Sequence, residues 1–202
     1  MSDQNKSEKH RLAMVKQKAN VDAAIANANR QQSVVVFLTG NGKGKSSSAF
    51  GMVMRALGYG QRVGVVQFIK GQQKSGEELY LEKFCPQVFF YQMATGFTWD
   101  TQNRDADKAA AEKAWQQALL LLNNNSFDLV VLDELTYMLA YHYLDETEVI
   151  AALKNRPAEQ SVVVTGRGGG EALRAVADTV SEIKEVKHAF RTGIMARKGV
   201  DY

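Results

Sequence analysis

A run of glycines, lysines and serines early in the chain has the residue types that bind polyphosphate. It reads Gly40-Asn41-Gly42-Lys43-Gly44-Lys45-Ser46-Ser47 and lies between an apolar run at 34–38 and a helix-like segment. Glycines let successive backbone N–H groups turn toward one anion, and a new helix adds its positive N-terminal end. Lys45 adds a charge, and the Ser46 hydroxyl can ligate Mg²⁺. We therefore predict that this run binds the phosphates of a nucleotide.

The run departs from the usual phosphate-loop pattern at one position. The pattern G-x-x-x-x-G-K-[ST] places a glycine five residues before Gly44, where this chain has Thr39, and Gly40 follows. The alternative interpretation is a glycine-rich turn without a phosphate role. The strand before the run, and the lysine, hydroxyl and helix after it, favour the phosphate loop.

A second candidate site is a pair of acidic residues, Asp133 and Glu134, which directly follows the apolar run 129–132. In phosphate-loop proteins a carboxylate at this position helps to hold the Mg²⁺ that the loop hydroxyl also contacts. The sequence therefore predicts a magnesium site formed by Ser46, Glu134 and Asp133. The alternative is that Glu134 only caps the following helix.

Two further segments contain side chains that suit a ligand but also have plain structural interpretations. Phe97 and Trp99 lie two residues apart among polar residues, where they could grip a flat ligand or pack in the core. Arg167 lies in the glycine-rich run 166–170 and could meet an anion or belong to a flexible connection. Neither segment indicates a function when taken alone.

The cysteine and histidine content argues against a zinc or iron–sulfur site held by the protein. The single cysteine, Cys85, cannot form an internal disulfide. The three histidines, His10, His142 and His188, show no metal-ligand spacing with it. We assign no chemistry to Cys85.

Charge is distributed unevenly along the 202 residues. Residues 1–32 hold six Lys/Arg and three Asp/Glu, so this segment carries the whole net charge of +3, and 19 residues of each sign remain elsewhere. A neutral body argues against a nucleic-acid partner. No run of about 20 apolar residues and no apolar N-terminal signal region occurs, so we expect a cytoplasmic protein without a membrane partner.

Within residues 1–32 the apolar residues Leu12, Val15, Ala19, Ala23 and Ala26 fall close to one helical face. This face is thin and rich in alanine. The segment is therefore either a helical arm that lies on a surface or a frayed, solvated tail.

The remaining residues alternate β-branched runs with helical patterns. We predict strands at 34–38, 62–69, 88–92, 129–132, 161–165 and 179–183. Helices are expected at 47–57, 78–84, 105–122, 135–143, 145–154 and 171–177. Nearly continuous apolar strands suit a sheet that is covered on both faces. The predicted fold is a doubly wound, mostly parallel α/β domain at 33–202 with helices on both faces, and its candidate residues follow the carboxyl ends of strands.

Together these residues resemble the bacterial P-loop ATP:corrinoid adenosyltransferases over nearly the whole chain. The similar segments are the basic N-terminal helix and residues 39–46, 64–71, 93–104, 131–137, 165–168, 186–190 and 199–202. The Asn-Gly-Lys-Gly-Lys loop and the Gly-Phe-Thr-Trp segment are the most specific. Ser46 and Ser47 stand where this family typically has Thr, and Asp100 stands where it often has Glu. These exchanges keep the hydroxyl and the carboxylate.

The resemblance implies a P-loop NTPase-like fold and transfer of the 5′-deoxyadenosyl group of ATP to Co(I) of a corrinoid, with release of triphosphate. Cobalt is then the nucleophile, so the protein must chiefly stabilise the leaving triphosphate. The implied ATP contacts are Gly40, Asn41, Gly42, Lys43, Gly44, Lys45, Ser46, Ser47 and Arg55. Lys45 and Glu134 are the implied catalytic residues, with Mg²⁺ on Ser46 and Glu134 and with Asp133 in support.

The resemblance also implies partners. Phe97 and Trp99 would approach the lower face of the corrin and displace its axial base. The arm at 1–32 would be a lid over the active site of the partner subunit in a homodimer. A flavodoxin-like or other reductant protein would supply an electron to Co(II). The preferred corrinoid, and a role in synthesis rather than salvage of adenosylcobalamin, are left open.

The residues by themselves leave two other functions open. A P-loop phosphotransferase or ATPase would use Asp133 and Glu134 to orient its nucleophile and Arg167 to stabilise charge. A nucleotide-regulated binding module would use the basic arm to hold a partner or nucleic acid. The Thr39 variant and the Gly-Phe-Thr-Trp segment argue against the phosphotransferase, and the neutral body argues against the binding module.

Overall fold

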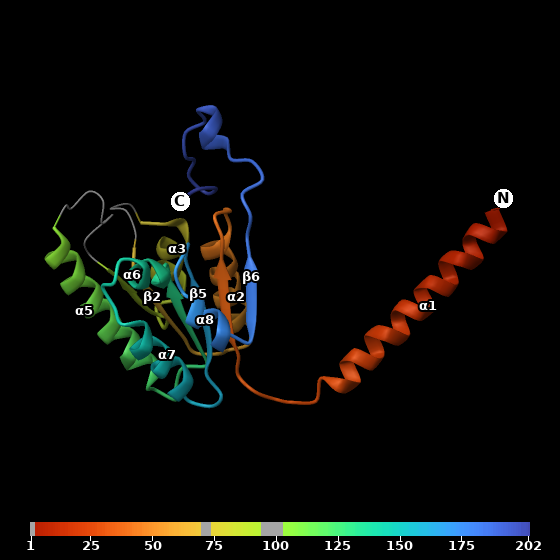
Figure 1. Cartoon of the computed structure of the whole chain (residues 1–202), viewed down its shortest axis with the longest axis horizontal. Coiled ribbons are helices and arrows are strands. Elements are labelled where there is room, and N and C mark those ends of the chain that lie inside the picture. Colours follow the sequence, from red (N-terminus) through yellow and green to blue (C-terminus); the bar gives the residue numbers. More distant parts are fainter. Residues whose placement is uncertain (1–2, 70–73, 94–102) are drawn as a thin grey trace. The chain divides into compact units, whose positions relative to one another are not determined.

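The computed structural model describes residues 3–69, 74–93 and 103–202, with side chains from residue 6 onward. The chain divides into two compact units, 1–32 and 33–202, which are described separately (Figure 1). The first unit contains helix α1 (Asp3–Asn27). Its side chains from residue 6 onward are exposed, including Leu12 and Val15 on one face and Met14, Val21 and Ile25 on another. The segment is therefore helical, and its role as a lid stays a prediction.

The second unit is built on a six-stranded sheet. Its strands are β1 (Val35–Thr39), β2 (Val63–Gln67), β3 (Phe89–Gln92), β4 (Leu129–Asp133), β5 (Ser161–Thr165) and β6 (Thr179–Glu182). Their order is β3-β2-β4-β5-β1-β6, and all neighbouring strands are parallel. Strand β5 lies between β1 and β4. The carboxyl ends of these three strands therefore meet at one edge of the sheet.

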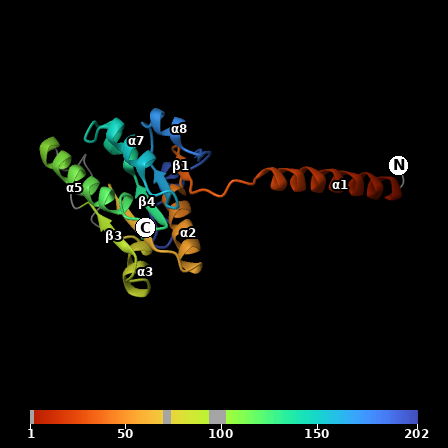
Figure 2. The ribbon, with the colours of Figure 1, turned by 90° about the horizontal axis from the view of Figure 1, so that it is seen from below.

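Helices cover both faces of the sheet. They are α2 (Lys45–Gly58), α3 (Gly76–Phe84), α5 (Arg104–Leu122), α6 (Leu135–Ala140), α7 (Glu146–Asn155), α8 (Glu171–Val176) and the 3₁₀ turn η1 (Ala189–Thr192). In Figure 2, α2 and α3 lie on one side of the strands and α7 and α8 on the other. Along β4, Val130 and Leu132 belong to the core on the α5 side, whereas Leu129 and Val131 belong to the core on the α2 side. The predicted doubly wound α/β fold is confirmed, with a sheet that is parallel throughout.

Several boundaries differ from the sequence prediction, and two of the differences have a clear local reason. Helix α3 begins two residues early because the Ser75 hydroxyl accepts a hydrogen bond from the N–H of Glu78 at 3.2 Å and caps the helix. Helix α6 stops at Ala140, and His142 has a left-handed φ of 55° that a helix cannot contain. The strand predicted to reach Ile69 ends at Gln67.

Within the three described ranges, we find no helix with the length and apolar character needed to span a bilayer.

Candidate active site

The phosphate loop packs directly against the chain that continues β6. The N–H of Gly42 donates to the carbonyl of Ile183 at 2.7 Å. A Cβ at Gly40 would lie 2.4 Å from the carbonyl oxygen of Ile183, and a Cβ at Gly42 would lie 2.7 Å from the Lys184 backbone. Gly40 also has a positive φ of 97°. These two glycines are therefore required by close approach of a distant strand as well as by any ligand.

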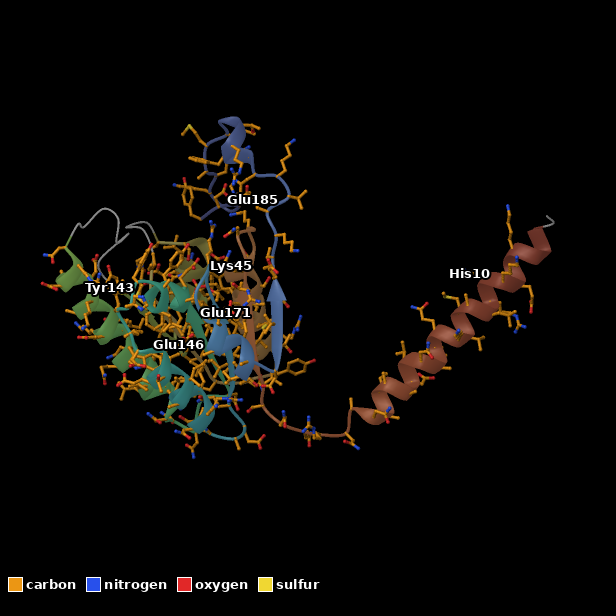
Figure 3. The ribbon with its side chains drawn as sticks, in the orientation of Figure 1. His10, Lys45, Tyr143, Glu146, Glu171 and Glu185 are labelled. Atoms are coloured by element: carbon orange, nitrogen blue, oxygen red, sulfur yellow. The ribbon has the colours of Figure 1, made fainter. Side chains whose placement is uncertain are left out.

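Lys45 is buried inside the loop that it terminates. Only 4% of the residue is exposed, and its Nζ donates to the carbonyls of Gly40 and Gly42 at 2.8 Å each. Figure 3 shows Lys45 among the side chains of the second unit. Burial lowers the pKa of Lys45, and the positive charge of Arg167 lowers it further, while Glu134 acts in the opposite direction. The ammonium group thus holds the loop closed and lies within electrostatic range of the residues opposite it.

Asp133 is fixed by the strands on both sides of β4. It is 1% exposed. Its Oδ2 accepts from Gln67 Nε2 at 2.6 Å and its Oδ1 accepts from Thr165 Oγ1 at 2.6 Å. The N–H of Glu134 in turn donates to Thr165 Oγ1 at 2.9 Å. The carboxylate is therefore held in one position by a buried network across β2, β4 and β5.

Glu134 has a backbone conformation that is uncommon for a residue with a side chain. It has φ 59° and ψ 24°, the left-handed region, at the first position before α6. Glu134 stands at the N-cap position of that helix, and its side chain makes no capping hydrogen bond there. A non-glycine residue with positive φ is costly and occurs often at functional sites.

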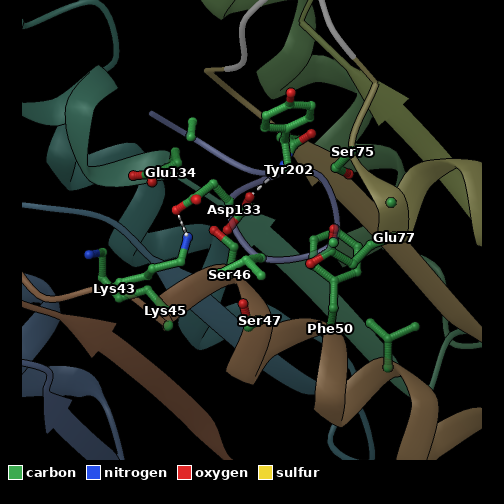
Figure 4. A pocket seen from close by; sticks show the side chains of 18 of the residues that line it. Lys43, Lys45, Ser46, Ser47, Phe50, Ser75, Glu77, Asp133, Glu134 and Tyr202 are labelled. Atoms are coloured by element: carbon green, nitrogen blue, oxygen red, sulfur yellow. Dashed lines mark hydrogen bonds and ion pairs between the residues drawn. The ribbon is translucent and has the colours of Figure 1, made fainter. Parts of the chain in front are cut away.

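One cavity of about 950 Å³ joins the predicted phosphate and acidic residues (Figure 4). The predicted residues that line it are Gly42, Lys43, Gly44, Lys45, Ser46, Ser47, Asp133, Glu134 and Arg167. They come from the ends of β1, β4 and β5 and from the start of α2. The tertiary structure therefore brings together residues that lie more than 100 positions apart in the sequence.

Not every predicted residue lines this cavity. Asn41 is exposed and borders a separate hollow with Glu182 and Lys184. Arg55 is exposed on α2, and among the described residues it is not part of the cavity wall. Phe97 and Trp99 lie outside the described residues. Contacts of these residues with ligands stay predictions.

Sequence reasoning missed two groups of residues around the site. Gln67 and Thr165 hold Asp133, but only the pairing of β2, β4 and β5 brings them to it. Residues 196 and 199–202 also line the cavity, and Asp201 forms an ion pair with Lys43 at 2.9 Å. The one available signal for this second group was the similarity of 199–202 to the adenosyltransferase family.

A family model described as "ATP:corrinoid adenosyltransferase BtuR/CobO/CobP" matches residues 31–202. The chain belongs to this family. The predicted family is therefore confirmed, and with it the prediction of an enzyme of the adenosyltransferase class.

Individual relatives agree with the family assignment. The chain is 50% identical over 195 residues to "Corrinoid adenosyltransferase" of Escherichia coli (strain K12), covering 96% of this chain and 98% of the relative. It is 51% identical over 197 residues to "Corrinoid adenosyltransferase" of Pseudomonas aeruginosa, covering 98% and 97%. It is 50% identical over 195 residues to "Corrinoid adenosyltransferase CobA" of Salmonella typhimurium, covering 96% and 98%. These matches span both units of the chain.

Proposed function

We propose that this chain transfers the 5′-deoxyadenosyl group of ATP to Co(I) of a corrinoid and releases triphosphate. The observation that carries the proposal is the single cavity in which the phosphate loop faces Asp133 and Glu134. The cobalt electron pair forms a bond with C5′ of the ribose. The bond from C5′ to the triphosphate oxygen breaks, and its electron pair leaves with triphosphate.

The phosphate loop stabilises the leaving group in this reaction. Triphosphate gains negative charge as the C5′–O bond breaks, so backbone N–H groups and the Lys45 ammonium lower the barrier by electrostatics. In the structure Lys45 Nζ donates to two loop carbonyls. A triphosphate oxygen would replace one of these acceptors, so Lys45 reaches the ligand by a small movement. No group is needed to remove a proton from the nucleophile, because cobalt carries none.

The residues around the cavity suit Mg²⁺. A hydroxyl and carboxylates are the hard oxygen ligands that this ion prefers. Both oxygens of Asp133 already accept hydrogen bonds from Thr165 and Gln67. We therefore assign direct ligation to Ser46 and Glu134, with Asp133 in support. When bound, Mg²⁺ supplies positive charge to the triphosphate oxygens.

The remaining parts of the proposal concern partners. The arm at 1–32 covers the active site of the second subunit of a homodimer, and its exposed apolar side chains are consistent with a covering surface. A reductant protein supplies one electron to Co(II), since the nucleophile is Co(I). Phe97 and Trp99 contact the corrin. We also propose that the protein is cytoplasmic, because the reaction consumes ATP and needs a strongly reduced metal.

Product analysis tests the proposed reaction. The chain is incubated without oxygen with Mg-ATP and chemically reduced cob(I)alamin, and phosphates and corrinoids are then separated. We expect one triphosphate for each light-sensitive adenosylated corrinoid. ADP and phosphate with an unaltered corrinoid would instead identify a phosphotransferase or ATPase and overturn the proposal.

A further inference from the structure

The segment that follows β6 contacts the phosphate loop at both of its ends. At its start, the carbonyl of Ile183 accepts the Gly42 N–H at 2.7 Å. At its end, Asp201 Oδ1 lies 2.9 Å from Lys43 Nζ. Figure 1 shows the chain leaving β6, passing through η1 and turning back toward the sheet. The two ends of the segment 183–201 thus contact two neighbouring residues of the phosphate loop, Gly42 and Lys43.

The C-terminal end of this segment forms a hydrogen-bonded turn. Asp201 Oδ2 accepts the N–H of Arg197 at 2.9 Å, and the N–H of Asp201 donates to the carbonyl of Arg197 at 2.8 Å. The hydrogen bond from the Arg197 N–H, followed by the contact with the Lys43 ammonium, lowers the pKa of Asp201. Farther out, Arg191 pairs with Glu185. The Asp201 carboxylate is therefore charged and presented to Lys43 by a preformed turn.

The same turn forms part of the cavity wall. Val200 and Tyr202 line the cavity, as do Phe50, Val53 and Met54 of α2, one to two helical turns beyond the phosphate-binding serines. Tyr202 is partly buried, and Figure 4 shows Tyr202 and Phe50 on different sides of the pocket. Apolar and aromatic side chains beside a phosphate loop suit the nucleoside of a nucleotide.

We propose that residues 196–202 are the wall that receives the nucleoside of ATP, and that the ion pair between Asp201 and Lys43 clamps this wall to the phosphate loop. The inference rests on the proposed function. It makes Asp201 a positioning residue. It also changes the role of Lys43, whose charge is engaged by Asp201, so that Lys45 carries the lysine charge that meets triphosphate.

Comparing the binding of two ligands distinguishes the proposed nucleoside wall and its ion pair from the phosphate loop. Mg-ATP contains the nucleoside, whereas inorganic triphosphate with Mg²⁺ contains only the part that the loop binds. Affinities of the full chain for both are measured by calorimetry. We expect Asp201→Asn to weaken ATP binding about fivefold, as for the loss of a partly exposed ion pair with its hydrogen bond. Triphosphate binding should stay unchanged or become tighter, because a negative charge near the cradle has been removed.

Matched variants complete the test. Asp201→Glu keeps the charge and should retain most of the affinity for ATP. Glu159→Gln removes a carboxylate from the loop before β5, at the opposite edge of the sheet, and should change neither affinity. Tyr202→Ala tests the wall without touching the ion pair, and should weaken ATP binding severalfold while leaving triphosphate binding unchanged.

Three outcomes would overturn the inference. Asp201→Asn that weakens both ligands equally would indicate a general structural role. Asp201→Asn that tightens both would show that Asp201 competes with phosphate and does not clamp a wall. A chain that binds neither ligand before any substitution would contradict the proposed function itself, and the clamp with it.

Discussion

Two glycine-rich loops lie side by side in this protein and differ in what their glycines do. Gly40 begins the phosphate loop after β1, and Gly166 begins the 166–170 loop after the neighbouring strand β5, where its N–H donates to the carbonyl of Leu38 at 3.2 Å. The phosphate loop opens the 14-residue helix α2, whereas the 166–170 loop opens a helix of only six residues. Of the two loops, only the phosphate loop is followed by both a buried lysine, Lys45, and a helix of several turns, α2.

The close contacts of the two loops also differ in kind. A Cβ at Gly42 would meet the backbone of Lys184, and a Cβ at Gly166 would meet the hydroxyl of Thr136 at 2.0 Å. Gly166 therefore packs on a side chain, and the residue that the 166–170 loop contributes to the cavity wall is Arg167. Glycine content alone thus does not identify a phosphate site, whereas the element that follows the glycines does.

The largest expected effect is on the rate of adenosyl transfer, and it distinguishes Lys45 of the phosphate loop from Arg167 of the 166–170 loop. Lys45→Met should lower the rate of adenosyl transfer at least about a hundredfold, the usual effect of removing one preorganised charge at a leaving group. Arg167→Met should cost about tenfold, because Arg167 is exposed and contributes at longer range. Rates are measured with chemically reduced corrinoid, and circular dichroism confirms folding. Equal losses would remove the distinction between the loops.

A stability experiment tests the two kinds of packing. Gly42→Ala and Gly166→Ala should each lower the free energy of unfolding by roughly 1–3 kcal/mol, the range for overpacking a tight site. Adding Thr136→Ala to Gly166→Ala should recover part of the loss, because the nearest obstacle there is a side chain. No single truncation offers such relief at Gly42, whose obstacle is backbone. Urea unfolding gives these values; absence of recovery in the double variant would contradict the packing argument.

A matched pair of glycines isolates the phosphate role from backbone strain. Gly44 and Gly168 both have positive φ, 121° and 63°, and a Cβ at either would meet no atom within 4 Å. Alanine at Gly168, which lies in the left-handed region, should cost roughly 1–2 kcal/mol of stability. Alanine at Gly44 should cost more, because its φ of 121° lies outside that region. Affinity for inorganic triphosphate, measured by calorimetry, should fall about tenfold only in Gly44→Ala, since Gly44 lines the cavity and Gly168 does not. Similar affinities in the two variants would exclude the predicted cradle at Gly44.

The smallest expected effect is a shift in pH dependence. Triphosphate binding needs the charged form of Lys45, so affinity should be full below the pKa of Lys45 and decline above it. Because burial and Arg167 lower this pKa, the decline should begin below the ordinary lysine range near about 10.4. Arg167→Gln removes one of the two causes and should move the decline to higher pH. Titrations at constant ionic strength test this; a decline at the same pH in both proteins would be inconsistent with the coupling.

The amino-acid sequence by itself determined the order of helices and strands, the phosphate loop and the acidic pair after β4. These features are local: apolar periodicity, capping residues and glycines at a strand end depend on neighbours in the chain. The confirmed family also came from such local segments, chiefly residues 39–46.

The tertiary structure alone decided how these pieces meet. Thr165 and Gln67 fix Asp133 only because β5 and β2 flank β4, and strand order depends on contacts between distant residues. Likewise, nothing local in residues 183–202 indicates that Ile183 supports Gly42 or that Asp201 reaches Lys43. Pairing across such sequence separations depends on the packing of the whole sheet, which no short segment specifies.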